Sequence, residues 1–411
     1  MSTQISVPAR ELPIAKASEA VQTKVQTGSR LLYIDNLRVF LTILVVIHHL
    51  AITYGADGGW FYHERPTTML AGILLTLFTG WNQFYFMGLF FLIAGYFVPG
   101  AIDRKGTRRF LKDRFVRLGI PFALFAVLVA PFLVYINGVF EGWWSGTLKD
   151  FLVRYWSTLM FDSGPLWFVE TLLVFSAVYA LGRAALNWLK RGTDKTETLL
   201  SRKPLSHQNI LASILVLALV TIVVRVFSPI GETWHNWQLA FYPQYILLFA
   251  AGILAYRRSW LDEITDRVRK VWSGAAVVAI FCLPLMMAAV VMMAPEAMES
   301  NLALLKGGIN PLAIITAVWE AVYCLAMPVL LLSVFRKRFN QSRRLSRLLA
   351  DNAYTVYIIH APVIVATALL FRSLALDPLL KFALVAPLAV ALCFLVSHFL
   401  VRRLPLADQV L

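Results

Sequence analysis

Hydrophobic runs long enough to cross a lipid bilayer recur from residue 31 almost to the end of the chain. A membrane-spanning helix needs about 20 predominantly apolar residues, and short polar segments separate runs of this length here. The pattern therefore predicts an all-α, polytopic membrane helix bundle. We expect ten spans, at residues 33–54, 80–99, 118–136, 165–182, 209–227, 240–256, 271–294, 311–335, 349–371 and 381–401.

Three stretches lie outside this pattern. Residues 69–79 are apolar but short, which favours an interfacial or re-entrant piece before the second span. Residues 1–30 are polar and charged, so we expect a disordered cytoplasmic tail and no cleavable signal peptide. Residues 31–403 would then form one transmembrane domain, followed by a short cytoplasmic tail at 404–411.

The distribution of Lys and Arg predicts the orientation in the membrane. With the N-terminus inside, 30 of the 38 cations fall on the cytoplasmic side and 6 on the opposite side. This asymmetry favours both termini in the cytoplasm. The net charge of +15 is then explained by insertion and by anionic lipid headgroups, so no nucleic-acid partner is expected.

Composition argues against redox or metal chemistry. The chain is 59% hydrophobic and 15% charged, and its three cysteines all lie in apolar segments. A cysteine in such a segment is more often a small packed hydrophobic residue than part of a disulfide or a metal site. We therefore expect no bound metal.

The first span carries ionisable residues, Arg38 and His49, eleven positions apart. Eleven residues at about 100° each make three helical turns, so the two side chains share a face and lie roughly 16 Å apart along the axis. Asp35 lies on the same face. Ionisable groups within a membrane helix point to a functional site by default. The alternative is that Arg38 and Asp35 form an ion pair that only orients the helix.

The segment 103–121 alternates seven cations with apolar residues, which predicts an amphipathic helix at the cytoplasmic membrane surface. Such a helix is suited to holding phosphates beside the bundle. Simple positive-inside anchoring explains the same charges. The cations singled out for donor binding are Arg108, Arg109, Arg114 and Arg117.

Later spans contain further polar residues. Glu170 follows Trp167 by about one turn, and an acid in a span indicates either a cavity or a partner for a buried cation such as Arg38. Tyr357 and His360 form a polar stripe that either lines an acceptor path or hydrogen-bonds neighbouring helices. The candidates for this acceptor path are Trp167, Tyr357 and His360. Arg225 and Glu320 we assign to packing or snorkelling.

Four segments in order resemble the acyltransferase-3 family of integral-membrane O-acyltransferases. They cover most of the chain and are residues 34–38 (IDNLR) with His49, residues 90–97 (FFLIAGYF) with the basic loop ending at 114–121 (RFVRLGIP), residues 164–170 (GPLWFVE) and residues 352–362 (NAYTVYIIHAP). Three positions depart from the family pattern. Asn36 replaces Gly or Ser, Ala94 replaces Ser, and His48 adds a histidine next to His49.

The resemblance implies transfer of an acyl group, such as acetyl or succinyl, from a cytoplasmic acyl-CoA to a hydroxyl of an extracytoplasmic glycan. His49 would be the base because imidazole titrates near the operating pH, and Arg38 would meet a donor phosphate or a polarised carbonyl. Spacing favours His49 over His48, which is turned by about 100°. Whether transfer is direct or passes through acyl-His49 stays open, as does a role for His48.

The resemblance also implies a multi-pass protein of the bacterial inner membrane, with acyl-CoA as a donor substrate and no bound cofactor. Transfer would go directly to the acceptor or through a separate extracytoplasmic partner, and a homodimer is an option. Aromatic residues in the outer loops, including those at 58–64, suit sugar rings, although an interfacial aromatic belt explains most of them. The alternatives from other classes are a secondary transporter or flippase, and a scaffold without catalysis.

Overall fold

The computed structural model describes residues 31–64, 68–189, 204–261, 264–293, 298–405 and 407–410, and within these ranges it is helical without β-strands. Ten helical stretches in them are long and apolar enough to span a membrane, as the sequence predicts. The α-helices are α2 (Leu32–Thr53), α3 (Met69–Gln83), α4 (Phe86–Lys105), α5 (Thr107–Arg114), α6 (Ile120–Leu124), α7 (Ala130–Phe140), α8 (Leu148–Ser157), α9 (Trp167–Leu189), α10 (His207–Phe227), α11 (Tyr242–Arg257), α12 (Asp266–Met293), α13 (Met298–Leu304), α14 (Pro311–Arg338), α15 (Arg344–Leu370), α16 (Pro378–Phe399) and α17 (Ala407–Val410).

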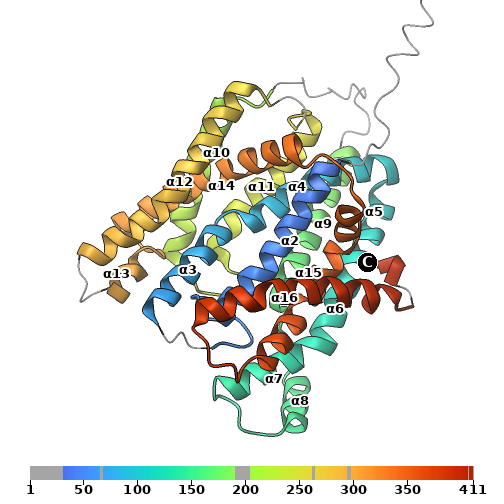
Figure 1. Cartoon of the computed structure of the whole chain (residues 1–411). Coiled ribbons are helices and arrows are strands. Elements are labelled where there is room, and N and C mark those ends of the chain that lie inside the picture. The colour runs from blue at the N-terminus through green and yellow to red at the C-terminus, as the bar shows by residue number, and fades with distance from the viewer. Residues whose placement is uncertain are drawn as a thin grey trace, which may run out of the picture.

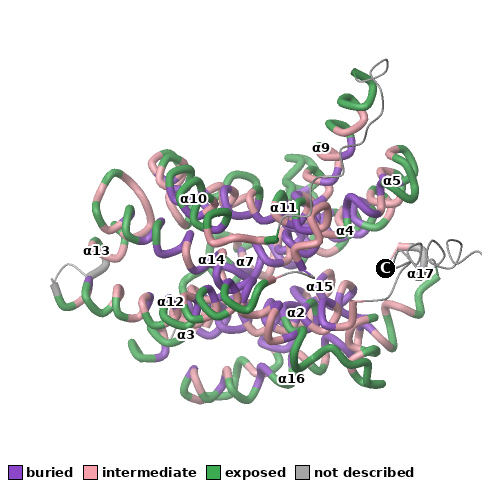
Figure 2. Tube along the Cα trace, turned by 90° about the horizontal axis from the view of Figure 1, so that it is seen from above, coloured by how far each residue is buried: buried purple, intermediate pink, exposed green. Residues whose placement is uncertain are grey.

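Helix α2 lies in the centre of the bundle, where it packs against α3, α14, α15 and α16 (Figure 1). Its sequence is apolar on nearly every side, and Leu37, Leu41 and Leu50 are fully buried. A helix that is hydrophobic all round is expected to be enclosed by other helices. Figure 2 shows the buried residues gathered in the middle of the bundle, with exposed residues on the outer helices. The polar residues of α2 therefore lie at the core of the molecule.

Helices α4 and α11 approach each other most closely at two glycines. A Cβ atom at Gly95 would lie 2.2 Å from the carbonyl oxygen of Phe249, and one at Gly252 would lie 2.1 Å from that of Leu92. Such distances leave no room for any side chain. Small residues at helix interfaces allow this kind of backbone contact in membrane proteins. Gly95 belongs to the segment 90–97 of the family resemblance, and its packing explains why glycine stands there.

The short apolar stretch before the second span is a helix of its own. Helix α3 extends to Gln83, and the chain breaks at Tyr85, which has φ −146° and ψ −32°. The ring of Phe84 packs edge-on against Phe241 and Trp319 at this break, with centroid distances of 5.8 and 5.0 Å. Tertiary packing therefore separates α3 from α4.

The basic segment is helical as predicted, but it continues directly into the third span. Helix α5 runs through a π-helical turn at Phe115–Gly119 into α6, and a second π-helical turn at Phe125–Val129 joins α6 to α7. Phe110 and Leu118 are buried, whereas Arg108, Arg109 and Arg117 are exposed, so the segment is amphipathic. Helix α8, which follows α7, is absent from the ten predicted spans because it is short and carries charges.

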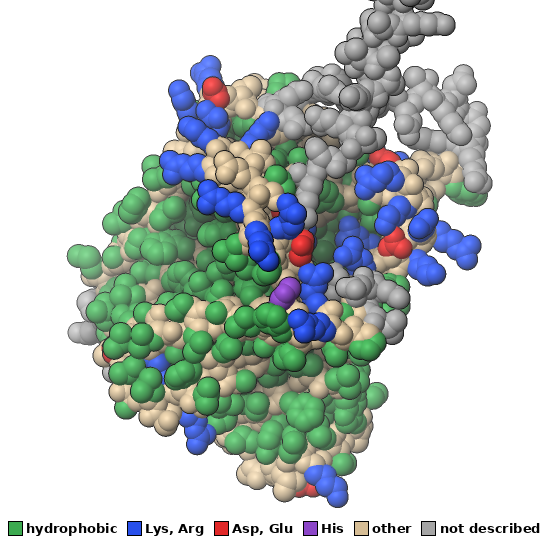
Figure 3. All heavy atoms as spheres, turned by 45° about the vertical axis from the view of Figure 1, so that its right-hand side comes forward, with side chains coloured by type: hydrophobic (Ala, Val, Ile, Leu, Met, Phe, Trp, Pro, Cys, Tyr) green, Lys and Arg blue, Asp and Glu red, His purple; other side chains and the backbone are tan. Residues whose placement is uncertain are grey.

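Lys and Arg side chains gather at one end of the molecule, above a broad hydrophobic surface (Figure 3). This basic end includes the C-terminal turns of α4 and α14, with Arg104, Lys105 and residues 336–338. Helix α2 begins near it and ends at the opposite side, toward α7 and α8 (Figure 1). The charge asymmetry that predicts the orientation is thus present in three dimensions.

Candidate active site

His49 lies in the last turns of α2, with its ring held by its own helix. Nδ1 is 2.9 Å from the carbonyl oxygen of Val45, one turn earlier. A carbonyl oxygen only accepts hydrogen bonds, so Nδ1 carries the proton and the neutral ring keeps its lone pair on Nε2. The backbone of α2 thus leaves Nε2 available as a base or a nucleophile.

His360, on α15, faces His49 with a ring-centroid distance of 5.0 Å. Its Nδ1 donates to the carbonyl oxygen of Tyr357 at 2.5 Å, which again places the lone pair on Nε2. The residue is fully buried, and no described residue forms a hydrogen bond with its Nε2. Two imidazoles from different helices therefore lie side by side, and each has its proton on Nδ1 and its lone pair on Nε2.

Trp60 forms the wall of this site on the side of the loop that follows α2. Its indole stacks on His49 with ring centroids 4.1 Å apart and lies 6.1 Å from His360. Its Nε1 is buried and has no hydrogen-bond partner among the described residues. The loop supplies both the wall of the histidine pair and an unused donor beside it.

An ion pair holds this loop in place. Lys381 Nζ lies 2.6 Å from Glu64 Oε2, and the lysine side chain is only 3% exposed. Lys381 also lies over the Tyr54 ring, 5.6 Å from its centroid. Burial and the nearby Glu64 carboxylate raise the pKa of Tyr62 to about 12, so this residue stays a neutral hydrogen-bond donor at physiological pH.

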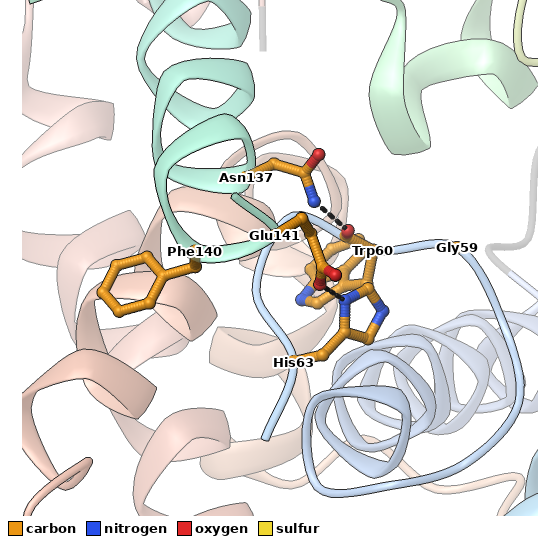
Figure 4. Close-up of a pocket in the computed structure, with 6 residues that line it drawn as sticks. All are labelled: Gly59, Trp60, His63, Asn137, Phe140 and Glu141. Carbon is orange, nitrogen blue, oxygen red and sulfur yellow. Dashed lines mark hydrogen bonds and ion pairs between the residues drawn. The ribbon is translucent and has the colours of Figure 1, made fainter. Parts of the chain in front are cut away.

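Beside Trp60 lies a cavity of about 500 Å³, lined by Gly59, Trp60, His63, Asn137, Phe140 and Glu141 (Figure 4). His63 Nδ1 is 2.9 Å from Glu141 Oε1, and Asn137 Nδ2 donates to the Trp60 carbonyl oxygen at 3.1 Å. An aromatic wall combined with amide, imidazole and carboxylate groups suits a polar ligand with apolar faces, such as a sugar. Its wall residue Trp60 stacks directly on His49.

The structure brings only part of the predicted acceptor path to the histidines. The Tyr357 hydroxyl donates to the carbonyl oxygen of Pro165, and the Tyr357 ring lies 5.5 Å from that of His360. Trp167 instead stacks on Tyr245, with centroids 5.3 Å apart. Tyr357 therefore connects α15 to the start of α9 and supports His360, whereas Trp167 belongs to the adjoining aromatic core.

Glu170 lies in the first turn of α9 and is held there by a residue of the loop before α11. Its Oε2 accepts a hydrogen bond of 3.1 Å from Nε1 of Trp237. The 3-10 turn at Gly164–Leu166, directly before α9, is fixed in a similar way, because Asp162 Oδ1 accepts hydrogen bonds of 2.6 Å from the Gly164 amide and from Asn236. Burial raises the pKa of Asp162. The partner seen for Glu170 is thus an indole rather than Arg38.

At the other end of α2, Arg38 forms an ion pair with Asp35, with 3.9 Å between Nη1 and Oδ1. Arg114 lies near Arg117 and Arg38, close enough for their charges to interact, and its guanidinium lies 5.2 Å from the Phe110 centroid. We call Arg38, Arg114 and Arg117 the basic cluster. Arg108 and Arg109 are exposed farther along α5. Like charges held together in this way favour an anionic ligand.

Asn36, which departs from the family pattern, has a structural role at this end. Its Nδ2 donates to the carbonyl oxygens of Phe339 and Gln341 at 2.6 and 3.2 Å. The amide thereby ties the start of α2 to the segment after α14. A glycine at this position would lack both hydrogen bonds.

The site thus has a basic cluster at one end of α2, a pair of imidazoles near the other end, and a polar cavity beyond them. Spacing in the sequence predicts the separation of Arg38 and His49, because both lie on one regular helix. It does not predict the contact of His49 with Trp60, which depends on a loop. The stripe of Tyr357 and His360 is visible in the sequence, but its meeting with α2 is a tertiary event.

Comparison with known proteins finds a matching family model and several relatives. Residues 31–398 match the model of an acyltransferase domain, the acyltransferase-3 model. The chain is similar to glucans biosynthesis protein C from Escherichia coli strains O1:K1, K12/DH10B and O157:H7, with 28% identity over 151 residues. This stretch is 36% of the chain and 37% of each relative. No solved structure matches the chain.

The matched domain covers nearly all of the helical bundle, including α2 with His49 and α15 with His360. Ten described helical stretches fit a membrane, and the similar proteins are bacterial, which places the chain in the bacterial inner membrane as a multi-pass protein. The chain belongs to the acyltransferase-3 family of integral-membrane proteins.

Proposed function

We propose that the protein transfers an acyl group, acetyl or succinyl, from a cytoplasmic acyl-CoA to a hydroxyl of an extracytoplasmic glycan. The observation that carries this proposal is the His49 imidazole, whose Nε2 is left as an acceptor and whose ring stacks on Trp60 at the edge of the polar cavity. A neutral imidazole in this position serves acyl transfer either as the base for the acceptor hydroxyl or as the nucleophile that takes the acyl group.

The basic cluster supports the choice of donor. Coenzyme A carries phosphates, and Arg38, Arg114 and Arg117 form a cationic group where α2 begins. Guanidinium groups bind phosphate with charge-assisted hydrogen bonds. The acyl arm would then follow α2 to His49, while the nucleotide stays at the basic end.

The cavity and the similar proteins support the choice of acceptor. The cavity offers the Trp60 indole, Asn137 and the His63–Glu141 pair, which together suit a sugar with hydroxyl edges and apolar faces. The similar proteins are named for glucan biosynthesis. We therefore place a glycan in this cavity, with one hydroxyl directed past Trp60 toward His49.

The proposal predicts that His49→Ala abolishes ester formation. A general base contributes roughly 10²- to 10⁴-fold to rate and a nucleophile no less, so glycan ester should fall below about one-hundredth of the native level. NMR of purified envelope glycans from cells with matched amounts of native or mutant protein in the membrane measures this directly, and the ester signals identify the acyl group. Cells with native protein and ester-free glycans, or equal ester in both strains, would contradict the proposal.

A further inference from the structure

The histidine pair contains more basic groups than a direct transfer requires. In a direct transfer, His49 alone takes the hydroxyl proton while the thioester is attacked. The Nε2 atom of His360 would then remain buried without any hydrogen-bond donor among the described residues. Buried polar atoms in native proteins are almost always paired, so this unpaired acceptor calls for a function.

We propose that the two histidines divide the reaction between them: His49 carries the acyl group covalently, and His360 is the base that delivers it to the acceptor. This inference rests on the proposed acyl transfer and specifies its route. It makes His360 a catalytic residue, since its Nε2 would touch the reacting hydroxyl.

In the first step, the Nε2 lone pair of His49 attacks the thioester carbonyl of the acyl-CoA. The carbon–sulfur bond breaks, and the thiolate of coenzyme A leaves with the electron pair. The acylated ring is cationic, and its Nδ1–H remains bonded to the Val45 carbonyl oxygen, which stabilises the positive charge. The nucleotide can then leave from the basic end before the acceptor binds.

In the second step, the acceptor hydroxyl enters from the cavity and gives its proton to Nε2 of His360. Its oxygen attacks the acyl carbon, the carbon–nitrogen bond breaks, and the electron pair returns to Nε2 of His49. The proton on His360 is then released to water, and its Nδ1–H stays bonded to the Tyr357 carbonyl oxygen throughout. A second base is essential here, because an acylated Nε2 has no lone pair for a proton.

His48 is the obvious competitor for the second role, but its geometry differs. Its ring lies edge-on to His49, with centroids 5.3 Å apart, and packs against Phe86 at 5.0 Å. As the neighbour of His49 on α2, it is turned by about 100° around the helix axis. His360 comes from the opposing helix, with its tautomer fixed, so it faces the His49 ring from outside α2. His48 is therefore the matched control.

The test uses membrane vesicles prepared from expressing cells, with ¹⁴C-acetyl-CoA or ¹⁴C-succinyl-CoA supplied to the cytoplasmic face. After a cold detergent quench, label is counted on the protein and on the glycan. We expect the native protein to pass one of the labels to glycan with little label on itself. His360→Phe should lower the rate of glycan labelling at least 100-fold and raise protein-bound label at least tenfold. Neutral hydroxylamine should release that label, as expected for an acyl-imidazole.

Three further variants make the result specific. Adding His49→Ala to His360→Phe should abolish the protein-bound label, whereas His48→Phe should give no accumulation. His360→Gln, with a side chain that cannot take up the proton, repeats the test if the phenylalanine variant fails to elute as a folded protein in size-exclusion chromatography. The proposal is overturned if the folded His360 variants label glycan at the native rate, or lose transfer without accumulating protein-bound label. If native vesicles label no glycan, the proposed function itself fails and this route falls with it.

Discussion

Trp60 connects the two parts of the proposed active site. Its indole stacks on the His49 ring with the ring centroids 4.1 Å apart, and the residue also lines the polar cavity. Its position depends on a loop, and loops hold catalytic residues only where other contacts fix them. The Lys381–Glu64 ion pair and the Asn137 hydrogen bond to the Trp60 carbonyl oxygen provide these contacts. Residues that hold this loop in place should therefore influence catalysis, although they lie outside the histidine pair.

We predict that Lys381→Met lowers both stability and turnover. The substitution leaves the Glu64 carboxylate without its ion-pair partner, which should destabilise the fold by about 1–3 kcal/mol because this remaining charge is partly buried. Movement of the loop would shift Trp60 away from His49 and reduce glycan ester severalfold. Thermal unfolding and the NMR ester count measure the two effects.

Lys306→Met provides the matched control. Lys306 pairs with Asp57 at 3.0 Å, but both side chains are well exposed, so its removal should change little. Adding Glu64→Gln to Lys381→Met should restore part of the lost stability, because it removes the unpaired charge. Equal losses in both lysine variants would contradict a specific role of the buried pair.

The sequence indicates the chemistry of individual residues better than their contacts. His49 and Arg38 share a face of one helix, so their relation follows from helix geometry alone. The ion pair of Arg38 with Asp35 is also predictable, since the residues are three apart. The contacts of His49 with His360 and Trp60 join segments that no local pattern links, and the hydrogen bond between Glu170 and Trp237 does the same. These depend on how whole helices and loops pack.

At the level of elements, the close contact of α4 and α11 fixes the scaffold beside α2. It depends on Gly95 and Gly252, whose hypothetical Cβ atoms would collide with carbonyl groups of the facing helix. Backbone cannot yield to such a collision as a flexible side chain can, so the helices would have to separate. These glycines therefore matter because the absence of a Cβ atom lets the two helices approach, and not because they make the chain flexible.

We predict that Gly95→Ala strongly destabilises the protein, by about 1–3 kcal/mol or more, and lowers its amount in the membrane. Gly274→Ala on α12 is the control, because a Cβ atom there meets nothing within 4 Å. That change should be neutral or stabilise the helix by about 0.5–1 kcal/mol. Thermal unfolding in detergent checks both, and similar melting temperatures for the two variants would refute the packing argument.

The ten spans follow from the sequence because apolar length is a direct requirement of the bilayer. The break between α3 and α4 does not, since Phe84 packs against distant aromatic residues there. Helix α9 extends to Leu189, beyond the predicted end at residue 182. Hydropathy does not detect this extension, because the residues after 182 include Arg183 and Asn187 and are less apolar. The sequence pattern does not predict helix α8, because hydropathy detects spans and not short polar helices. The predicted tail at 1–30 lies outside the described residues.

At the level of the whole molecule, the chemistry is distributed between two ends. The basic cluster lies where α2 begins, whereas the histidine pair and the polar cavity lie toward the end of α2. Positive charge favours the cytoplasmic side, so the proposed donor and acceptor would approach from opposite sides of the membrane. The prediction that both termini are cytoplasmic has the same physical basis. Acyl transfer would therefore have a defined direction across the membrane, from the basic cluster toward the polar cavity.

The most direct measurement is acyl transfer across the membrane of right-side-out vesicles that retain their envelope glycan. ¹⁴C-acetyl-CoA or ¹⁴C-succinyl-CoA is either trapped inside or added only outside, and label on the glycan is counted for native protein and for His49→Ala. We predict labelling by native protein with trapped donor, at least tenfold less with external donor, and none with His49→Ala. Equal labelling from both sides, or labelling that persists in His49→Ala, would contradict directional acyl transfer that depends on His49.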